Sequence, residues 1–306
     1  MVVYVDPRLI GRKNFEELVN KYPKINFITE IKDKSTVEVM FTMPQLVKEM
    51  NVLDYKKLRF IQYLMAGYDG IDLDLLKENN IIFSNAQDIF SKSIAEDVFT
   101  KILYFNRNIK HYIDCKKTGR WEPIREEPEL TNSTVLILGT GSIGKELAVR
   151  LKAFETTVIG YRKTYKEEEN FDEIITDEES LNIALQRADY VILALPLNEK
   201  TKYFFNKEKI NMMKPSSLLI NVARGKVVNQ EDLYDALKNE KIRGAGLDVF
   251  DPEPLPKDNP IWKLDNVYIT PHNASSSNYM RDRLYQLIIT NLDLYLEGKP
   301  VKYRLN

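Results

Sequence analysis

A four-residue apolar run passes directly into a glycine-rich turn in the segment Val135-Leu136-Ile137-Leu138-Gly139-Thr140-Gly141-Ser142-Ile143-Gly144. An amphipathic helical pattern follows it. Strand, Gly-x-Gly-x-x-Gly turn and helix in this order are typical of a dinucleotide-binding fold, because the helix N-terminus presents free N–H groups to phosphate. The first glycine permits the tight turn, the second lets the backbone approach the pyrophosphate, and the third lets helix and strand pack. A glycine turn in another α/β fold, or for a different nucleotide, remains the alternative.

Short apolar runs alternate with helical patterns on both sides of this segment. Such alternation predicts parallel sheets covered by helices. We therefore expect an α/β protein with two Rossmann-like, doubly wound parallel sheet domains and an inter-domain cleft. The expected strands are 2–5, 26–29, 37–42, 59–66, 81–84, 134–138, 156–161, 190–195, 218–222, 244–249 and 267–270. The expected helices are 15–22, 44–49, 72–79, 93–117, 142–154, 231–239 and 281–296.

One domain is expected to consist of a single continuous segment, and the other of the two ends of the chain. Residues 95–280 should form the dinucleotide-binding Rossmann domain. Residues 1–94 and 281–306 together should form a flavodoxin-like, substrate-binding domain. Two domains suit a length of 306 residues, because domains commonly have roughly 100–200 residues each.

The composition excludes several classes of protein. Lysine and arginine number 44 against 45 aspartates and glutamates, so no polybasic surface for nucleic acid is indicated. No apolar run approaches the roughly 18 residues of a membrane span, and the N-terminus lacks the pattern of a signal peptide. The single cysteine, Cys115, cannot form an intrachain disulfide, which fits a reducing compartment. We expect a cytoplasmic protein without nucleic-acid or membrane partners.

The residues after the second strand of the nucleotide-binding domain bear on which dinucleotide binds. An NAD site has an acidic residue there that accepts hydrogen bonds from the ribose hydroxyls. This chain has Arg162, Lys163 and Thr164 instead, and two cations with a hydroxyl suit a 2′-phosphate. We therefore expect NADP(H) to be preferred over NAD(H). The alternative is a solvated basic pair, with Glu167 or Glu168 reaching the ribose.

Three charged side chains follow strands of the same domain. His272 is the candidate general acid, because ligands bind at strand ends and free imidazole titrates near about pH 6.5. Arg224 could bind a carboxylate bidentately, and Glu253 could orient a histidine and stabilise its charge. Singly, Arg224 could be a surface cation and Glu253 could belong to a proline turn. The other histidine, His111, lies inside a helical pattern and is interpreted as a surface or packing residue.

The ordered motifs resemble those of the D-2-hydroxyacid dehydrogenase family, which includes glyoxylate/hydroxypyruvate reductases and phosphoglycerate dehydrogenases. The resemblance covers nearly the whole chain and is most specific over residues 134–274. The main motifs are 136–144, 221–225, 247–254 and 270–272, supported by 66–72, 94–96, 188–197 and 213–215.

The resemblance implies reduction of a small 2-keto acid to the D-2-hydroxy acid. It implies that Arg224 binds the substrate carboxylate, that His272 donates the proton as hydride arrives from C4 of the nicotinamide, and that Glu253 pairs with His272. The backbone of Ala66 and Gly67 would hold the carboxylate from the first domain, and Asp248 would bind the nicotinamide carboxamide. The implied cofactor-binding residues are Gly139, Thr140, Gly141, Ser142, Ile143, Gly144, Tyr161, Arg162, Lys163, Thr164, Leu195, Pro196, Val222, Ala223, Arg224, Asp248 and His272.

Further implications concern assembly and specificity. Members of the family are usually homodimers, and no metal site is expected. Arg162 departs from the acidic residue of NAD-preferring members, Asp97 stands where histidine is common, and Asn273 stands where an aliphatic residue is common. Tyr68 and Phe90 are candidate pocket residues. A nucleotide-sensing, corepressor-like binding protein on the same fold is the competing hypothesis.

Overall fold

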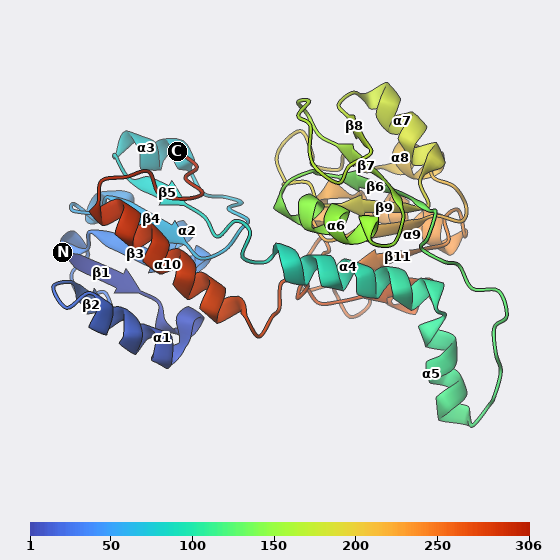
Figure 1. The fold of residues 1–306 in the computed structure, drawn as a ribbon, viewed down its shortest axis with the longest axis horizontal. Helices are drawn as coiled ribbons and strands as arrows, with labels where there is room; N and C mark the ends of the chain where they lie inside the picture. Colours follow the sequence, from blue (N-terminus) through green and yellow to red (C-terminus); the bar gives the residue numbers. More distant parts are fainter. The chain divides into compact units, whose positions relative to one another are not determined.

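The computed structural model describes residues 1–306, except for the side chain of Pro7, and forms two compact units. One unit comprises Met1–Phe90 and Ser277–Asn306, and the other comprises Ser91–Ser276 (Figure 1). The boundaries expected from the sequence were 94/95 and 280/281. Each unit is a parallel sheet with helices, which confirms the α/β class and the two Rossmann-like domains.

The first unit holds a five-stranded parallel sheet in the order β2-β1-β3-β4-β5. Helix α10 joins this unit although it comes from the C-terminal end of the chain: Asp293 accepts hydrogen bonds from Lys21 at 3.0 Å and Tyr22 at 2.6 Å, next to α1. The strands are β1 (Val2–Val5), β2 (Asn26–Ile28), β3 (Val39–Thr42), β4 (Phe60–Tyr63) and β5 (Ile82–Ser84). The helices are α1 (Pro7–Lys21), η1 (Lys34–Thr36), α2 (Pro44–Glu49), η2 (Val52–Asp54), α3 (Leu73–Glu78) and α10 (Met280–Leu296).

The second unit holds a seven-stranded parallel sheet in the order β12-β11-β10-β9-β6-β7-β8. The strand order reverses beside β6, and ligands bind at such a switch point in doubly wound sheets. The strands are β6 (Thr134–Leu138), β7 (Thr157–Tyr161), β8 (Glu173–Ile175), β9 (Tyr190–Leu193), β10 (Leu218–Asn221), β11 (Gly244–Leu247) and β12 (Val267–Ile269). The helices are α4 (Ser91–Asn106), α5 (Ile109–Thr118), α6 (Ser142–Lys152), α7 (Glu178–Arg187), α8 (Lys207–Met212), η3 (Gly225–Val227), α9 (Gln230–Lys238) and η4 (Pro260–Lys263).

Alternate residues of β6 face opposite sides of this sheet. Val135 and Ile137 pack in an apolar cluster with residues of α4 and α6, whereas Leu136 and Leu138 pack with residues of α7, α8 and α9. Both faces of the strand are therefore buried, which explains why it is an uninterrupted apolar run. The same packing fixes where the glycine turn leaves the sheet.

Two sequence-based expectations about helices are wrong. The single helix expected over 93–117 is two helices, because Asn108 adopts a left-handed backbone with φ 45°, which asparagine tolerates. Helix α1 begins at Pro7 rather than at residue 15, because Asp6 caps it by accepting from the Arg8 amide at 3.1 Å. Gly11, with φ 77°, interrupts that helix and breaks the periodic pattern.

Other elements were not anticipated. Strand β8 has three residues, and α7 and α8 are short, so none gives a long periodic pattern. Among the described helices, none combines the length and apolar character needed to cross a membrane.

Candidate active site

The glycine turn after β6 has the geometry that its sequence predicts. Gly139 has φ 111°, and a Cβ there would lie 2.6 Å from the carbonyl oxygen of Ala194. A Cβ on Gly144 would lie 2.2 Å from the carbonyl oxygen of Gly139, so α6 packs tightly on the turn. A Cβ on Gly141 would meet no atom within 4 Å. The turn therefore leaves open space in front of the N-terminus of α6, where a phosphate can approach the backbone.

A cavity of about 900 Å³ opens at this turn, within the range of nucleotide and cofactor sites. Tyr161 and Phe204 stack in its wall, with ring centroids 5.9 Å apart and planes 14° apart. The predicted cofactor residues that line it are Gly139, Thr140, Gly141, Tyr161, Arg162, Lys163, Leu195 and Pro196. The remaining lining residues, which the sequence did not single out, are Ala194, Asn198, Glu199, Lys200, Thr201 and Phe204.

One feature of the sequence could have predicted that the loop over residues 196–201 lines the cofactor cavity. It follows a buried strand, β9, directly beside β6, so it belongs to the same carboxyl edge of the sheet. Its residues have no recognisable phosphate-binding pattern of their own. Predicted cofactor residues outside the lining of this cavity are Ser142, Ile143, Gly144, Thr164, Val222, Ala223, Arg224, Asp248 and His272.

Three cations converge on one carboxylate beside this cavity. Glu168 accepts from Lys145 at 2.7 Å and from Arg162 at 2.8 Å, and Lys166 lies 3.4 Å away. The side chain of Glu168 is only 8% exposed. The hydrogen bond from Lys145, supported by those from Arg162 and Lys166, lowers the pKa of Glu168 to about 2 against the desolvation that opposes it. The cluster therefore keeps a net positive charge at neutral pH.

His272 and Glu253 form a hydrogen-bonded pair after neighbouring strands. Nδ1 of His272 lies 2.6 Å from Oε2 of Glu253, while Oε1 of Glu253 accepts from the amide of Phe250 at 2.8 Å. Because a carboxylate only accepts, Nδ1 carries the proton and Nε2 is left for a substrate. The backbone of His272 has φ 52°, an uncommon conformation for a residue other than glycine. The pair that the sequence predicted is thus assembled by the fold.

Asp248 holds the loop that carries His272. Its side chain accepts from the Thr270 hydroxyl at 2.6 Å and from the amides of Asn273 and Ala274 at 3.0 to 3.2 Å. Its backbone carbonyl accepts from the His272 amide at 2.8 Å. Asp248 is 2% exposed, so these contacts are protected from water. They give Asp248 a positioning role that the sequence did not suggest.

A buried lysine extends this network into α4. Lys101 is fully buried and donates to Thr270 at 2.8 Å and to Asp97. Burial raises the pKa of Asp97, while the hydrogen bond from Lys101 opposes that shift. Asp97, noted in the sequence only as a departure, is therefore one end of a partly buried chain of polar contacts that reaches Asp248.

Arg224 follows β10, the strand next to β11. Asn221 shapes the turn, since its side chain accepts from the Ala223 amide at 3.0 Å and donates to the Arg224 carbonyl at 3.1 Å. A Cβ on Gly225 would lie 1.9 Å from the carbonyl oxygen of Phe250, so this turn packs directly on the segment that leads to Glu253. The three predicted catalytic residues therefore follow adjacent parallel strands, β10, β11 and β12, at one edge of the sheet.

A second cavity, of about 420 Å³, borders the histidine. Its walls are mostly apolar, with Glu253, His272 and Asp248 as the charged or titratable members. Trp262 is 49% exposed in this wall. The remaining lining residues are Phe250, Pro254, Leu255, Ile269 and Pro271.

The substrate-binding residues expected in the first unit follow β4. Ala66 and Gly67 are half-buried, and the Ala66 carbonyl accepts from the Asn85 side chain at 2.7 Å. Tyr68 is 38% exposed and Phe90 is buried. Their part in binding a substrate stays a prediction.

Residues 99–274 match the family described as D-isomer specific 2-hydroxyacid dehydrogenase, NAD binding domain. The chain belongs to this family. It is an NAD(P)-dependent oxidoreductase acting on CH–OH donors, as the names of its relatives indicate. The family that the motifs predicted is thereby confirmed.

Individual known proteins are similar to this chain over most of their length. The chain is 32% identical over 286 residues to the glyoxylate reductase of Pyrococcus furiosus, covering 90% of this chain and 84% of that protein. It superposes with a TM-score of 0.86 and 26% identity on an acyclic imino acid reductase in complex with NADPH and D-Arg, over 100% of both chains. A D-isomer specific 2-hydroxyacid dehydrogenase from Xanthobacter autotrophicus Py2, in complex with NADPH and MES, gives a TM-score of 0.82 and 26% identity over 100% and 97% of the two chains.

Proposed function

We propose that this chain reduces a small 2-keto acid, of the glyoxylate or hydroxypyruvate type, to the D-2-hydroxy acid with NADPH as the preferred cofactor. The observation that carries the proposal is the 2.6 Å contact between His272 and Glu253, at the carboxyl edge of the sheet whose glycine turn opens onto the large cavity. The 32% identity to a glyoxylate reductase supports the substrate class.

The catalytic roles follow from the chemistry of these side chains. A bound nicotinamide cofactor, held at the glycine turn, supplies the hydride. His272 donates a proton from Nε2 to the substrate oxygen, because Nδ1 is held by Glu253. Glu253 stabilises the imidazolium, and Arg224 binds the substrate carboxylate through its planar guanidinium. Ala66 and Gly67 are proposed, from the family resemblance, to contribute backbone donors to the same carboxylate.

The preference for NADPH rests on charge. Lys145, Arg162 and Lys166 carry three positive charges against the one negative charge of Glu168. A phosphate monoester carries a charge of roughly −1.5 to −2 at neutral pH, so a 2′-phosphate suits this surplus better than a neutral ribose hydroxyl does. Two similar solved structures hold NADPH, which supports the same preference. The alternative, in which Glu168 accepts from the ribose of NADH, predicts the opposite cofactor.

One experiment tests substrate and cofactor together. Initial rates are measured for NADPH and NADH against a panel of 2-keto acids, including glyoxylate, hydroxypyruvate and pyruvate. We expect the highest kcat/KM with NADPH and a small keto acid. A higher kcat/KM with NADH would refute the cofactor preference, and no turnover with any acid would favour the nucleotide-sensing binding protein. We also propose a homodimer, which sedimentation of the purified chain checks.

A further inference from the structure

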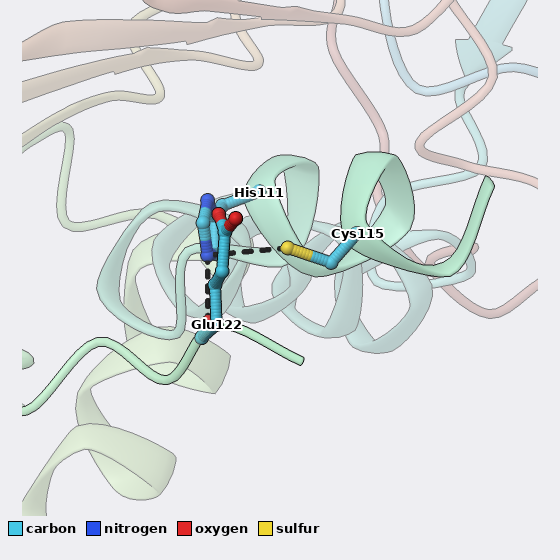
Figure 2. Close-up of side chains that lie close together, drawn as sticks. All are labelled: His111, Cys115 and Glu122. Carbon is cyan, nitrogen blue, oxygen red and sulfur yellow. Dashed lines mark hydrogen bonds between the residues drawn. The ribbon is translucent and has the colours of Figure 1, made fainter. Parts of the chain in front are cut away.

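A cluster of three metal-ligating side chains lies on α5 and on the segment that follows it, separate from the residues that line the two cavities described above. His111, Cys115 and Glu122 each offer one ligand atom, and these atoms all lie within 4.8 Å of one another (Figure 2). We propose that this cluster binds one thiophilic divalent cation, with Zn²⁺ as the physiological ion. The proposal departs from the expectation, drawn from sequence, that the chain has no metal site.

The local fold brings the three residues together. His111 and Cys115 are four residues apart on one helix, so their side chains share a face. The helix ends at Thr118 and is capped by Gly119, whose left-handed backbone has φ 68° and whose amide donates to the Cys115 carbonyl. The chain then reverses, and the Ile124 amide donates to the Tyr112 hydroxyl at 3.2 Å. This return places residue 122 beside the face that carries the imidazole and the thiol, as Figure 2 shows.

The distances suit a tetrahedral ion. Sγ of Cys115 and Nε2 of His111 lie 3.4 Å apart. An ion about 2.3 Å from sulfur and about 2.1 Å from nitrogen would make an angle of about 100° with that pair, close to tetrahedral. The backbone carbonyl of Glu122 lies 2.9 Å from the same nitrogen and can only accept, so Nε2 carries a proton that points at it in the metal-free chain. Binding of the ion therefore requires that Nε2 lose this proton and that the carbonyl move aside. After that movement, the imidazole, the thiolate and the Glu122 carboxylate can supply three ligands.

The ligand types select the metal. A thiolate with an imidazole and a carboxylate is a donor set for Zn²⁺, whereas Mg²⁺ and Ca²⁺ require oxygen ligands. The sulfur is protected, because Cys115 is 5% exposed, and His111 lines a cavity of about 500 Å³ through which an ion can enter. Arg120 donates to one carboxylate oxygen of Glu122 at 3.0 Å and orients the group. The same ion pair competes with the metal for that charge, so we expect a weaker site than one with four protein ligands.

Binding would have a structural consequence. The ion would join residue 122 to the helix that carries residues 111 and 115, and so would hold the segment after α5 against it. A ligand that binds only the folded chain raises its melting temperature. Zn²⁺ is therefore expected to raise the Tm of the whole chain, by an amount that disappears when the thiol is removed.

Titration with Co²⁺ tests the proposal directly, because the thiol is the only one in the chain. The purified full-length chain should bind one equivalent, develop thiolate-to-cobalt charge-transfer absorption, and lose it when Zn²⁺ is added. Cys115→Ser should abolish this absorption, and His111→Gln and Glu122→Gln should each weaken Co²⁺ binding at least about tenfold. Asp114→Asn, an acidic residue of the same helix outside the cluster, serves as the matched control and should bind as the parent does.

Two results of the Co²⁺ titration would overturn the site. One is the absence of charge-transfer absorption in the parent chain. The other is unchanged Co²⁺ affinity in His111→Gln and Glu122→Gln, which would indicate a metal on the thiol alone. Circular dichroism of each variant establishes that it is folded. The Tm measurement gives an independent reading, since an equal rise with Zn²⁺ in the parent and in Cys115→Ser would also contradict the proposal.

Discussion

Nδ1 of His272 lies 2.6 Å from Oε2 of Glu253, although the two residues are nineteen positions apart in the chain. The contact exists because β11 and β12 are parallel neighbours, so the segments that follow them meet at one edge of the sheet. Asp248 then fixes the backbone of His272 through its own carbonyl. The imidazole is therefore held by its side chain and by its backbone at once, which is the arrangement a proton donor needs.

Replacement of His272 should remove the proton donor and little else. His272→Ala is expected to lower kcat by about 10²- to 10⁴-fold, the usual contribution of general acid catalysis, and to raise the Kd for NADPH far less. Steady-state kinetics and fluorescence titration measure the two quantities. Lys116→Gln, at an exposed position of α5, is the control and should keep the parent kcat. Near-normal turnover in His272→Ala would remove this residue from the role.

A double-mutant cycle on kcat tests whether Glu253 acts through His272. If Glu253 acts through His272, the effects of Glu253→Gln and His272→Ala should not add in the double variant, because the two groups work as a unit. Additive losses of kcat would indicate that Glu253 has a separate function.

Arg224 should matter for the carboxylate of the substrate. Arg224→Lys keeps the charge but loses the planar pair of donors, so kcat/KM for keto acids should fall by about 10- to 100-fold, as expected for a lost charged hydrogen bond of roughly 1.5–3 kcal/mol. Ketones that lack a carboxylate should be affected much less. Lys226→Gln, two residues along the chain, is the control. An equal fall for both kinds of substrate would show that Arg224 does not bind the carboxylate.

Much of this site could be predicted because strand ends are visible in the sequence. The apolar runs before Arg224, Glu253 and His272 predict strands, and the fold class then predicts that their carboxyl ends share one edge. Likewise, Gly139 and Gly144 have backbone neighbours that exclude any side chain, so the spacing of the glycines reports a real steric requirement.

The features of the fold and site that the sequence did not predict depend on contacts between distant segments or on a backbone conformation that the residue type only permits. Lys101 lies in a helical pattern, and its burial against Thr270 depends on how α4 packs on the sheet. Glu168 was considered only as an acceptor for ribose, because the sequence does not show that Lys145 reaches it from α6. The break at Asn108 depends on a left-handed backbone that asparagine permits but does not require.

The charge cluster should control the choice of cofactor. Glu168→Gln removes the one negative charge of the cluster and so makes it more positive. The ratio of kcat/KM for NADPH to that for NADH should therefore rise. Arg162→Ala should lower the same ratio. Both are measured from initial rates at fixed ionic strength, because exposed charges are screened by salt. A selective loss of kcat/KM with NADH in Glu168→Gln would instead identify Glu168 as the acceptor for the ribose hydroxyls.

The same carboxylate should make stability depend on pH in the acid range. Hydrogen bonds from Lys145 and its neighbours lower the pKa of Glu168 to about 2 from an ordinary value of 4.5. A carboxyl group whose pKa is lower in the folded state stabilises that state above the ordinary value, and this contribution is lost as pH falls from about 4.5 to about 2. The Tm of Glu168→Gln should therefore depend less steeply on pH over that range. Parallel curves for the variant and the parent would contradict the assignment.

The ion pair between buried Lys101 and half-buried Asp97 should affect stability and activity together. Lys101→Met leaves the Asp97 carboxylate, which is 17% exposed, without its cation. Because breaking a fully buried pair costs about 3–5 kcal/mol of folding free energy, we expect a loss somewhat below that range. The double variant Lys101→Met with Asp97→Asn should recover part of that loss, because it removes the buried charge as well. Urea unfolding of the parent, both single variants and the double variant measures the coupling, and additive free energies would show that the two residues do not act as a pair.

The kcat of these variants distinguishes a positioning role of Lys101 from a purely structural one. Lys101 holds the hydroxyl of Thr270, which in turn donates to Asp248, so the double variant should still misplace the loop that carries His272. We therefore expect kcat to stay low in the double variant even where its stability recovers, while KM for the keto acid changes little. If kcat recovers together with the free energy of unfolding, Lys101 only stabilises the fold and does not position the catalytic histidine.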